Sequence, residues 1–313
     1  MKMRNLGRSQ IEIPAVVFGG NVFGWTADEA TSFRLLDELM DAGLNAIDTA
    51  DVYSIWAPGH KGGESETILG KWMQARNNRG RVTIATKVGM AMGENKGLSA
   101  AWIGRAVEDS LRRLQTDCID LYQAHVDDGD VPLEESLGAF SRLIEAGKVR
   151  AIGCSNYTAD RLQAALDISS KHGLPRYESV QPQYNLVHRQ EFEGELAELC
   201  ARENIGSISF YGLAAGFLSG KYRTPADAEK SSRGRVSTLM TERNLAILDV
   251  VLNVAREEQT TPSAVAIAWL ISRPHLTAPI VSATSSAQLR EIVDAVSLQL
   301  SPQSLKALDE ASA

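Results

Sequence analysis

Four residues that could carry out proton-coupled chemistry follow three consecutive short apolar segments. Asp48 and Tyr53 lie in the segment AIDTADVY, Lys87 lies in TIATKVG, and His125 lies in LYQAHVDD. Lys87 follows Asp48 by 39 residues (87 − 48) and precedes His125 by 38 (125 − 87), so each interval has room for a helix and the next strand. In a parallel α/β barrel the carboxyl ends of the strands meet at one rim. The spacing therefore predicts that these four side chains come together.

Such side chains suit the reduction of a carbonyl group, which needs a hydride at carbon and a proton at oxygen. A free tyrosine has a pKa of about 10, so it holds its proton at neutral pH but gives it up reluctantly. A buried ammonium nearby favours the phenolate. Lys87 fits that part, and Asp48 would hold the lysine in place and keep it charged. Tyr53 would then be the general acid, and His125 could donate a hydrogen bond to the carbonyl oxygen.

Each of these residues, considered alone, also has a structural explanation. An aspartate at a strand end is commonly a cap or an ion-pair partner, and a strand lysine often extends to the rim with its stem buried. His125 could be a hydrogen-bonded core residue, and Tyr53 could pack over the barrel mouth. A barrel aldolase or isomerase would also use a strand-end lysine, but as a Schiff base. The joint placement of the four residues favours the reductase chemistry.

Short apolar runs alternate with helix-length amphipathic stretches, which is typical of βα units that build a parallel sheet. The runs predicted as strands are AVVFGG (15–20), LNAIDTA (44–50), VTIATKV (82–88), CIDLYQAH (118–125), VRAIGCSN (149–156), SVQPQYN (179–185), GSISFYG (206–212) and APIVSAT (278–284). The stretches predicted as helices are 28–42, 64–77, 99–114, 133–146, 158–171, 193–204, 242–258, 262–272 and 286–297. Ser99 and Thr158 are predicted N-caps, and Gly43 and Gly147 are placed to follow helices as C′ residues.

Two further features complete the predicted architecture. Residues 3–13 predict an N-terminal β-hairpin that turns at Gly7 and Arg8, and residues 224–237 form a long polar loop after the seventh strand, typical of a lid or a disordered segment. The sequence thus predicts an α/β fold, a (β/α)₈ TIM barrel with this hairpin and this loop. Because such a barrel takes about 250 residues, we expect one domain over residues 1–313.

Composition argues against several classes of function. Of the 313 residues, 44% are hydrophobic and 23% are charged, and the net charge of −7 (32 − 39) disfavours nucleic acid as a main partner. Cys118, Cys154 and Cys200 form no CxxC pair and no cluster with histidine, so we expect reduced thiols and no metal site. The first residues show no apolar signal-peptide core, and no apolar run reaches the roughly 18 residues of a membrane span. We therefore expect a cytoplasmic protein that binds no membrane, with the oligomeric state left open.

Nearly the whole chain resembles the aldo-keto reductase family. The motifs that carry the resemblance, in the family's order, are DTADVY, ATKVG, YQAH, GKVRAIGCSNY (147–157), VQPQYNL (180–186) and GFLSGKYR (216–223). The resemblance implies an (α/β)₈ barrel that reduces aldehydes and ketones, or oxidises alcohols in reverse, with a nicotinamide cofactor that is usually NADPH. It makes Asp48, Tyr53, Lys87 and His125 the catalytic tetrad. The β-subunits of voltage-gated potassium channels share this fold, so a nicotinamide-binding regulatory subunit with vestigial activity is the alternative.

A cofactor site is implied by the same resemblance. Ser155, Asn156 and Gln181 match positions that hydrogen-bond the nicotinamide carboxamide, and Phe210 matches an aromatic ring that stacks on the nicotinamide. The implied positions of the loop around the pyrophosphate are Tyr211, Gly212, Leu213, Gly216, Leu218, Ser219 and Lys221. The chain has no GxGxxG motif, so a Rossmann domain is not indicated.

The eighth strand departs from the family pattern. Many relatives place a lysine or arginine just after it to hold the 2′-phosphate of NADPH, whereas this chain reads VSATSSAQLRE (281–291). The positions expected to contact the cofactor there are Ser282, Thr284, Ser285 and Gln288. Hydroxyls and N–H groups at a helix N-terminus can still bind phosphate. We therefore expect NADPH to be preferred by a narrower margin than in relatives with a basic clamp, and NADH stays open as a cofactor.

Aromatic residues mark the expected substrate site. Phe23, Trp25 and Trp56 lie on predicted loops that should overhang the barrel mouth, although one or two of these rings could simply pack the loops. Aromatic walls suit an apolar or ring-shaped carbonyl compound. Val126 is small where relatives often carry a bulkier side chain after the histidine, which indicates a roomier pocket.

Overall fold

In the computed structural model, eight parallel strands close into a barrel. The structure describes residues 3–93, 95–229 and 235–313. Around the barrel the strands follow the order β10-β3-β4-β5-β6-β7-β8-β9. Their bounds are β3 (Val17–Gly19), β4 (Ala46–Asp48), β5 (Thr83–Val88), β6 (Ile119–Ala124), β7 (Val149–Ser155), β8 (Tyr177–Gln181), β9 (Gly206–Ser209) and β10 (Ala278–Val281). The predicted (β/α)₈ TIM barrel is confirmed.

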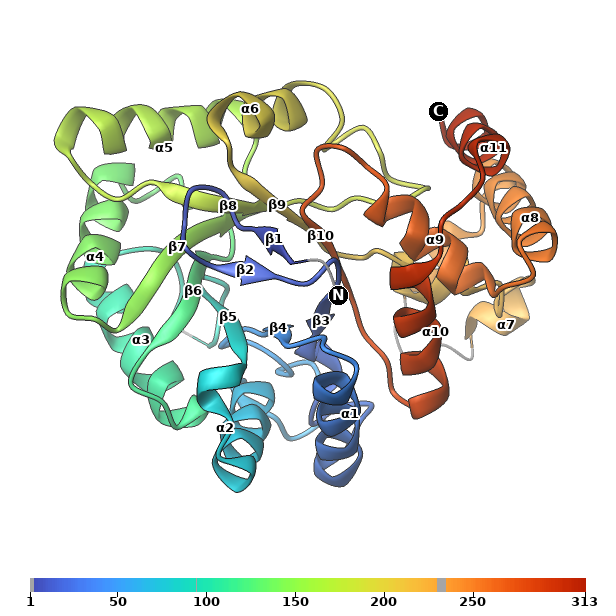
Figure 1. The fold of residues 1–313 in the computed structure, drawn as a ribbon. Helices are drawn as coiled ribbons and strands as arrows, with labels where there is room; N and C mark the ends of the chain where they lie inside the picture. The colour runs from blue at the N-terminus through green and yellow to red at the C-terminus, as the bar shows by residue number, and fades with distance from the viewer. Residues whose placement is uncertain (1–2, 94, 230–234) are drawn as a thin grey trace.

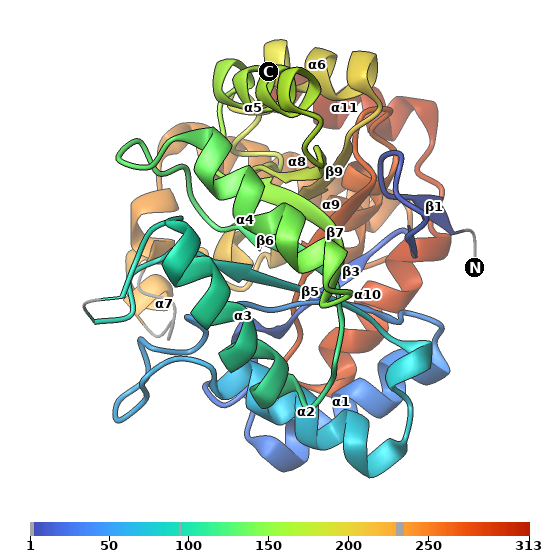
Figure 2. The same cartoon turned by 90° about the vertical axis from the view of Figure 1, so that its left-hand side faces the viewer.

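Helices surround the barrel, as Figures 1 and 2 show. The α-helices are α1 (Glu29–Asp41), α2 (Glu64–Arg76), α3 (Ala100–Leu114), α4 (Leu133–Glu145), α5 (Ala159–His172), α6 (Glu195–Glu203), α7 (Pro225–Glu229), α8 (Glu242–Glu257), α9 (Pro262–Ile271), α10 (Ser286–Ser297) and α11 (Pro302–Ser312). The 3₁₀ helices are η1 (Gly20–Val22), η2 (Arg79–Arg81), η3 (Ala214–Ser219) and η4 (Arg235–Leu239). Every helix predicted from the sequence is present, with its ends within two residues of the prediction.

Local signals explain why several helices begin and end where they do. The Ser99 hydroxyl accepts the N–H of Trp102 at 3.3 Å, and the Thr158 hydroxyl accepts the N–H of Arg161, also at 3.3 Å. Both predicted N-caps are confirmed, and each supplies an acceptor to a first-turn N–H group that has no partner within the helix. These helices carry the chain from one barrel strand to the next.

The N-terminal hairpin closes one end of the barrel. Its strands, β1 (Arg4–Asn5) and β2 (Glu12–Ile13), pair antiparallel, which confirms the prediction. Leu6, Ile11 and Ile13 are buried in a cluster with the inward-facing apolar side chains of the barrel strands. Figure 1 shows the hairpin across the centre of the ring of helices, and in Figure 2 it lies on the opposite side of the molecule from α7. A binding site in the barrel must therefore lie at the other end.

The turn of the hairpin lies directly against the barrel. Gly7 has a φ of +61°, and a Cβ at this position would lie 2.3 Å from the carbonyl oxygen of Glu178. The N–H of Arg8 donates to the Glu178 carboxylate at 2.7 Å. Only glycine fits both the left-handed backbone and the close approach.

The sixth barrel strand lies earlier in the chain than predicted. The sequence predicted residues 179–185, whereas β8 begins at Tyr177 and ends at Gln181. Pro182 has no N–H group and cannot continue the hydrogen-bonded ladder. Beyond it, only an isolated bridge joins Gln183 to Phe210. The prediction of this strand was wrong at both ends, and the strand end is fixed by the proline.

The polar segment after the seventh barrel strand is partly helical. The sequence predicted a loop over residues 224–237, but α7 and the beginning of η4 fall inside it. Residues 230–234 of this prediction lie outside the described residues. None of the described helices is both long and apolar enough to cross a lipid bilayer.

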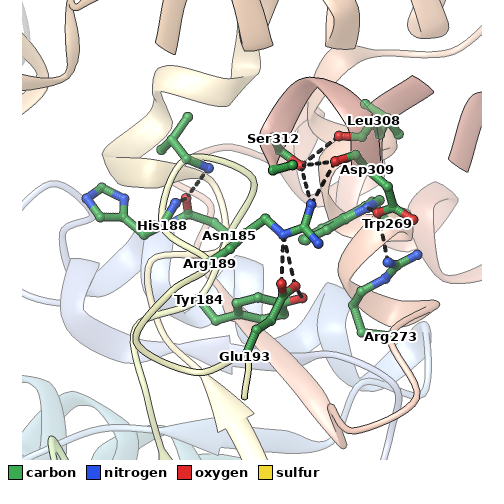
Figure 3. Close-up of polar contacts among 12 residues, drawn as sticks. Tyr184, Asn185, His188, Arg189, Glu193, Trp269, Arg273, Leu308, Asp309 and Ser312 are labelled. Carbon is green, nitrogen blue, oxygen red and sulfur yellow. Dashed lines mark hydrogen bonds and ion pairs between the residues drawn. The ribbon is translucent and has the colours of Figure 1, made fainter. Parts of the chain in front are cut away.

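The C-terminal helix, α11, was not predicted from the sequence, and polar contacts fasten it to the barrel. The guanidinium of Arg189, from the segment between β8 and α6, donates to the carbonyl of Asp309 at 2.9 Å and to the Ser312 hydroxyl at 2.8 Å. The Asp309 carboxylate accepts the indole N–H of Trp269 at 2.7 Å and a guanidinium N–H of Arg273 at 2.8 Å. Figure 3 shows these residues converging from three separate segments of the chain.

Candidate active site

The carboxyl ends of the strands bring the four predicted catalytic residues together. Asp48 ends β4, Lys87 is the penultimate residue of β5, and His125 directly follows β6. Tyr53 lies on the segment between β4 and α2. Its ring centroid is 5.9 Å from that of His125, and its hydroxyl is 3.2 Å from Lys87 Nζ. The predicted convergence of the four side chains is present in the structure.

Lys87 is the centre of this group and is fully buried. Its Nζ donates to Asp48 Oδ2 at 2.5 Å, to the carbonyl oxygen of Thr49 at 2.8 Å and to the Tyr53 hydroxyl at 3.2 Å. An ammonium group has three N–H donors, and each has an acceptor here. The lysine is thus held in one orientation, with a charged donor aimed at the tyrosine oxygen.

Burial and neighbouring charge act in opposite directions on the pKa values of Lys87 and Tyr53. Burial acts to lower the pKa of Lys87, but the charge of Asp48 and the Tyr53 oxygen outweigh it and raise the pKa above its ordinary value. The lysine is therefore an ammonium at neutral pH. The pKa of the Tyr53 hydroxyl is raised, because burial outweighs the lowering effect of Lys87. The net shift of the Tyr53 pKa is therefore upward, opposite to the shift expected from the lysine alone, and the tyrosine keeps its proton.

His125 is neutral at physiological pH. Its side chain is buried, and burial together with the charge of Lys87 lowers the pKa of the imidazole well below its usual value. A neutral imidazole has one N–H donor and one acceptor nitrogen. Within the described residues Nδ1 has no hydrogen-bond partner. The ring is thus an uncharged group at the wall of the site.

A cavity of about 1220 Å³ opens at this rim, and Asp48, Tyr53 and His125 line it. Lys87 lies behind them, in contact with Asp48 and Tyr53 but away from the open space. Pockets for ordinary small ligands measure about 300–1,000 Å³. The cavity is therefore large enough for a substrate and an extended cofactor together.

Most of the predicted cofactor positions line the same cavity. They are Ser155, Asn156, Gln181, Phe210, Tyr211, Gly212, Leu213, Gly216, Ser219, Lys221, Ser282, Thr284 and Gln288. They come from the ends of β7 and β8, the segment from the end of β9 to just beyond η3, and the segment from the end of β10 into the first turn of α10. The cavity thus runs from the four predicted catalytic residues to the beginning of α10.

The polar residues at the ends of β7 and β8 are connected to the predicted catalytic group by hydrogen bonds. Asn156 Nδ2 donates to the carbonyl oxygen of His125 at 2.9 Å and to the Ser155 hydroxyl at 3.1 Å. The Ser155 hydroxyl donates to the carbonyl oxygen of Gln181 at 3.0 Å, and Gln181 Nε2 donates to Asp48 Oδ1 at 2.8 Å. These contacts fix the side chains before any ligand binds.

Unusual backbone conformations cluster on the cavity wall. Asn156, Tyr211 and Ala215 line the cavity with φ values of +59°, +59° and +56°. Positive φ is uncommon for residues other than glycine. Such residues cost roughly 1–3 kcal/mol each and gather at ligand sites, where the surrounding structure holds them. Three of these residues thus lie on the cavity wall, where the surrounding structure holds their backbone conformations.

At the far end of the cavity, the hydroxyl and N–H donors expected to meet the cofactor already have acceptors within the protein. The Ser282 hydroxyl donates to Asn21 Oδ1 at 2.6 Å. The N–H and hydroxyl of Thr284 both donate to Gln288 Oε1, at 2.9 and 3.1 Å. Glu291 lines the cavity one turn further along the chain. The amide oxygen of Gln288 thus accepts the hydrogen bonds that a bound anion at the start of α10 could otherwise accept.

Besides Lys87, four predicted site positions do not line the cavity. Leu218 and Phe23 are fully buried in the main hydrophobic cluster, because the 3₁₀ turns η3 and η1 direct them inward, where apolar side chains are most stable. Phe23 therefore does not overhang the mouth. Ser285 serves as the N-cap of α10, where its hydroxyl accepts the N–H of Gln288. Val126 is half-buried and lies outside the lining.

The mouth of the cavity has an aromatic wall next to the predicted general acid. The rings of Trp25 and Trp56 meet edge to face at 5.6 Å, and Trp56 lies equally close to Tyr53. Ile55 and Met90 also line the cavity. Trp56 is 45% exposed, which is unusual for so large an apolar side chain and leaves its ring accessible to a ligand.

Some residues of the site were not identified from the sequence. Thr261 and Ser263 line the cavity at the start of α9. The Thr261-Pro262 pair is a typical helix start and could have indicated them. Gln123, buried beneath the cavity, donates to Asp48. It lies two residues before His125, and alternate strand residues point to the same face, which was the available signal.

Comparisons with known proteins agree on one family. A family model described as "Aldo/keto reductase family" matches residues 15–313. The chain is 34% identical over 321 residues to the uncharacterised oxidoreductase YrpG of Bacillus subtilis, an alignment that covers 99% of this chain and 95% of that protein. It is 29% identical over 341 residues to versiconal hemiacetal acetate reductase of Aspergillus parasiticus, covering 99% and 96%. It is 32% identical over 327 residues to a putative voltage-gated potassium channel subunit beta of Schizosaccharomyces pombe, covering 98% and 92%.

Proposed function

This chain belongs to the aldo/keto reductase family, and we propose that it is an NADP(H)-dependent oxidoreductase that reduces an aldehyde or ketone, or oxidises the alcohol in reverse. The observation that carries the proposal is the buried Lys87 ammonium, which contacts both the Asp48 carboxylate and the Tyr53 hydroxyl at the wall of a large cavity. A charged donor fixed on a phenol oxygen stabilises the phenolate that remains once the proton has been transferred.

Tyr53 is the general acid in this proposal. A nicotinamide bound in the cavity would supply the hydride that reduces the carbonyl carbon. Negative charge then develops on the carbonyl oxygen, and the Tyr53 hydroxyl donates its proton to it. Lys87, 3.2 Å from the tyrosine oxygen, stabilises the phenolate that remains, while Asp48 holds the ammonium in place. Because burial keeps Tyr53 protonated, the proton stays available until this step.

His125 orients the carbonyl group. Its lowered pKa keeps the imidazole neutral, so it can donate an N–H without adding a second positive charge beside Lys87. A single fixed donor aimed at a developing oxyanion contributes roughly 10²–10³-fold to the rate. The proposed role of His125 is therefore to bind and polarise the substrate oxygen next to Tyr53.

The charge state of Lys87 argues against the aldolase or isomerase alternative. A Schiff base forms through attack by a neutral amine. The Asp48 carboxylate and Tyr53 together raise the pKa of Lys87 and keep it an ammonium. All its donors are also engaged, and it lies behind the cavity wall. These properties favour a positioning charge over a nucleophile.

The chain has the groups that a nicotinamide dinucleotide needs. Ser155, Asn156 and Gln181 would hold the carboxamide, Phe210 offers a ring face for the nicotinamide, and Lys221 offers positive charge to the pyrophosphate. All five line one continuous cavity. Aromatic stacking and charge-assisted contacts then suit the two ends of the mononucleotide.

We propose NADPH as the preferred cofactor, by a narrow margin over NADH. At the start of α10 the 2′-phosphate would meet Ser282, Thr284 and Gln288, none of which is charged. A hydrogen bond to a charged group contributes about 1.5–3 kcal/mol, against about 1 kcal/mol for a neutral one. The preference rests on neutral contacts and is correspondingly small.

The substrate class follows from the mouth of the cavity. Trp25, Trp56 and Tyr53 present aromatic surface, and Ile55 and Met90 add apolar surface. Such walls suit an apolar or aromatic carbonyl compound. Nitrobenzaldehyde is a suitable test substrate for this reason.

Replacement of the proposed acid tests the function. Tyr53→Phe should lower kcat for nitrobenzaldehyde reduction by roughly 10²–10⁴-fold, because the general acid is lost. The Kd for NADPH should change little, since the phenyl ring remains. Loss of NADPH absorbance measures the rate, and protein fluorescence measures binding.

Tyr184→Phe is the matched control, because it also removes one tyrosine hydroxyl, the donor to Glu193 at 2.6 Å in the region shown in Figure 3. It should retain wild-type kcat. If the Tyr53 variant kept more than about a tenth of wild-type kcat, the loss would be too small for a general acid and the assigned role would be wrong.

A regulatory subunit is the second candidate, favoured by the likeness to the putative potassium channel subunit beta. That protein is named as a putative subunit of a channel. Steady turnover of nitrobenzaldehyde by the wild type supports the enzyme. Tight NADPH binding with no more than a single turnover would favour the regulatory role.

A further inference from the structure

Gln123 connects the proposed catalytic group to the proposed cofactor site. It is fully buried beneath the cavity, on β6. Its Nε2 donates to Asp48 Oδ1 at 3.3 Å, and its Oε1 accepts from Gln181 Nε2, also at 3.3 Å. Gln181 Nε2 donates to Asp48 Oδ1 at 2.8 Å as well. Two amides and one carboxylate oxygen thus form a closed ring of hydrogen bonds.

The charge of Asp48 fixes how both amides point. The Asp48 carboxylate is paired with Lys87, so it can only accept hydrogen bonds. Both amide nitrogens must therefore face it. With its nitrogen on Asp48, Gln123 presents its oxygen to the second N–H of Gln181. Both N–H groups of Gln181 are then used inside the protein, and its amide oxygen is left for the cavity that Gln181 lines.

A glycine on the neighbouring strand, β7, leaves space for the Gln123 side chain. Gly153 of β7 is the register partner of Gln123. A Cβ at Gly153 would lie 3.3 Å from Gln123 Cγ and 2.2 Å from the Ser179 hydroxyl. A larger residue at this position would clash with Ser179 and press on the aliphatic part of the Gln123 side chain. The glycine thus allows the glutamine to reach Asp48 and Gln181 together.

We propose that Gln123 is a positioning residue that fixes the Gln181 amide with its oxygen toward the cavity, where it accepts an N–H from the carboxamide of the nicotinamide cofactor. This inference rests on the proposed function. Without the Gln123 oxygen, the second N–H of Gln181 would have no partner, and only the hydrogen bond to Asp48 would hold the amide nitrogen inward. The Gln181 oxygen would then be a less firmly fixed acceptor for the cofactor carboxamide.

The experiment compares two cofactors that differ at the carboxamide. NADPH carries the amide NH₂, whereas its 3-acetylpyridine analogue carries a methyl group there and cannot donate. Gln123→Met keeps the length and bulk of the side chain but removes the donor and the acceptor. The variant should bind NADPH roughly three- to tenfold more weakly than wild type, the loss of one hydrogen bond, and bind the analogue nearly as well as wild type does. Fluorescence titration gives the four Kd values.

A second pair of variants tests whether Gln123 acts through Gln181. Gln181→Met removes the acceptor itself and should weaken NADPH binding at least as much. The double variant should lose little beyond the Gln181 variant, because residues in one network are not additive. Independent, additive losses would overturn the proposal, as would equal weakening of NADPH and the analogue by Gln123→Met.

Gln123→Glu provides a test that holds even if the methionine variant fails to fold. A protonated glutamic acid can donate to Asp48 and accept from Gln181, as glutamine does, whereas a glutamate repels Asp48. NADPH affinity of this variant should therefore recover as the pH is lowered, relative to wild type at each pH. An affinity that stays well below that of wild type at every pH would contradict the proposal. Gln163→Met is the control: it removes an amide on α5 that donates to Asp167 and accepts from Arg202, away from the cavity lining, and it should leave binding unchanged.

Failure of this inference is distinguishable from failure of the proposed function. If the wild type binds neither NADPH nor the analogue, the proposed function is wrong, and this inference is overturned with it. If the wild type binds and turns over NADPH while Gln123→Met is indistinguishable from wild type with both cofactors, only the role of Gln123 is overturned.

Discussion

Asp51 is a buried carboxyl group close to the proposed catalytic residues. It is 1% exposed. Within the described residues, neither carboxyl oxygen makes a hydrogen bond of ordinary geometry, although the N–H of Val52 lies near enough to lower the pKa slightly. Burial, reinforced by the negative charge of Glu66, raises the pKa of Asp51 to about 8. Asp51 is therefore protonated in the folded protein at neutral pH.

Asp51→Asn should stabilise the protein at pH 7 and leave its stability unchanged at pH 4. In the unfolded chain an aspartate has a pKa of about 3.9, so the unfolded state releases the proton that the folded state keeps. Folding is opposed increasingly as the pH rises from the unfolded pKa to the folded pKa of about 8. Asparagine carries no such cost, and one pKa unit corresponds to about 1.4 kcal/mol, so we expect a gain of roughly 2–4 kcal/mol at pH 7. Urea unfolding at both pH values measures it.

Asp117→Asn serves as the control for this prediction, because Asp117 is exposed and the same chemical change should have little effect there. A variant of Asp51 that is less stable than the wild type at pH 7 would show that the ionised carboxylate is stabilised in the folded protein, contrary to our expectation.

Among the elements, helix α10 begins at the cavity with its first donors already occupied. The N–H and hydroxyl of Thr284 donate to the side chain of Gln288, which follows one turn later. A phosphate that uses these donors must displace the amide oxygen. Glu291 also lines the cavity there and repels an anion. Both features weaken binding of the 2′-phosphate, so they support the proposal that NADPH is preferred over NADH by only a narrow margin.

Gln288→Arg should widen that preference. The substitution frees the donors of Thr284 and adds a guanidinium, so a charge-assisted contact of about 1.5–3 kcal/mol becomes available to the 2′-phosphate. We expect the Kd for NADPH to fall by roughly 10- to 100-fold and the Kd for NADH to stay nearly unchanged. Fluorescence titration of wild type and variant with both cofactors measures the effect.

Gln163→Arg places the same charge on α5, away from the cavity lining, and controls for general attraction of the anionic cofactor. If Gln288→Arg strengthened NADH and NADPH equally, the 2′-phosphate would not lie at this helix start. Tighter binding of NADH than NADPH by the wild type would contradict the proposed cofactor preference itself.

Elements with a clear repeating pattern could be predicted from the sequence. Apolar periodicity, together with caps such as Ser99 and Thr158, placed the main helices, and the alternation of runs indicated the barrel. The C-terminal helix α11 was missed, although Ser301 and Pro302 form a typical helix start, because its stability depends on distant partners such as Arg189. Long-range contacts of this kind leave no local signal.

The candidate site could be predicted only as far as the strand ends. The meeting of Asp48, Lys87 and His125 follows from the barrel topology. The inward direction of Phe23 does not, because it depends on how η1 turns. The net direction of the Tyr53 pKa could not be predicted either, since it is the balance of burial against the charge of Lys87 at a distance that only the structure gives.

At the scale of the whole molecule, the contacts in Figure 3 fasten the C-terminal helix to two earlier segments. Asp309→Ala should lower the free energy of unfolding by roughly 2–4 kcal/mol, because it leaves the indole N–H of Trp269 and a guanidinium N–H of Arg273 without their acceptor. The proposed catalytic residues lie elsewhere, so kcat should change little. Urea unfolding and the nitrobenzaldehyde assay measure the two effects.

Glu310→Ala, one residue further along α11, controls for the loss of a negative charge from this helix. Glu310 is exposed and lies 3.7 Å from Lys306, and exposed pairs of this kind contribute about 0–1 kcal/mol. Equal stability of the Asp309 variant and the wild type would show that the contacts of Asp309 contribute nothing net to folding.

The way the barrel closes has a consequence for the biosynthesis of the protein. β10 pairs with both β3 and β9, so the ring cannot close until nearly all of the chain has left the ribosome. Asp48, Tyr53, Lys87 and His125 have all been synthesised by then, but the cavity is also walled by residues as late as Ile292. Under the proposed function, an unfinished chain would carry the four proposed catalytic side chains without a complete cofactor site. Translation would have to reach α10 before the protein could bind the cofactor that supplies the hydride, so chains that end earlier should have no reductase activity.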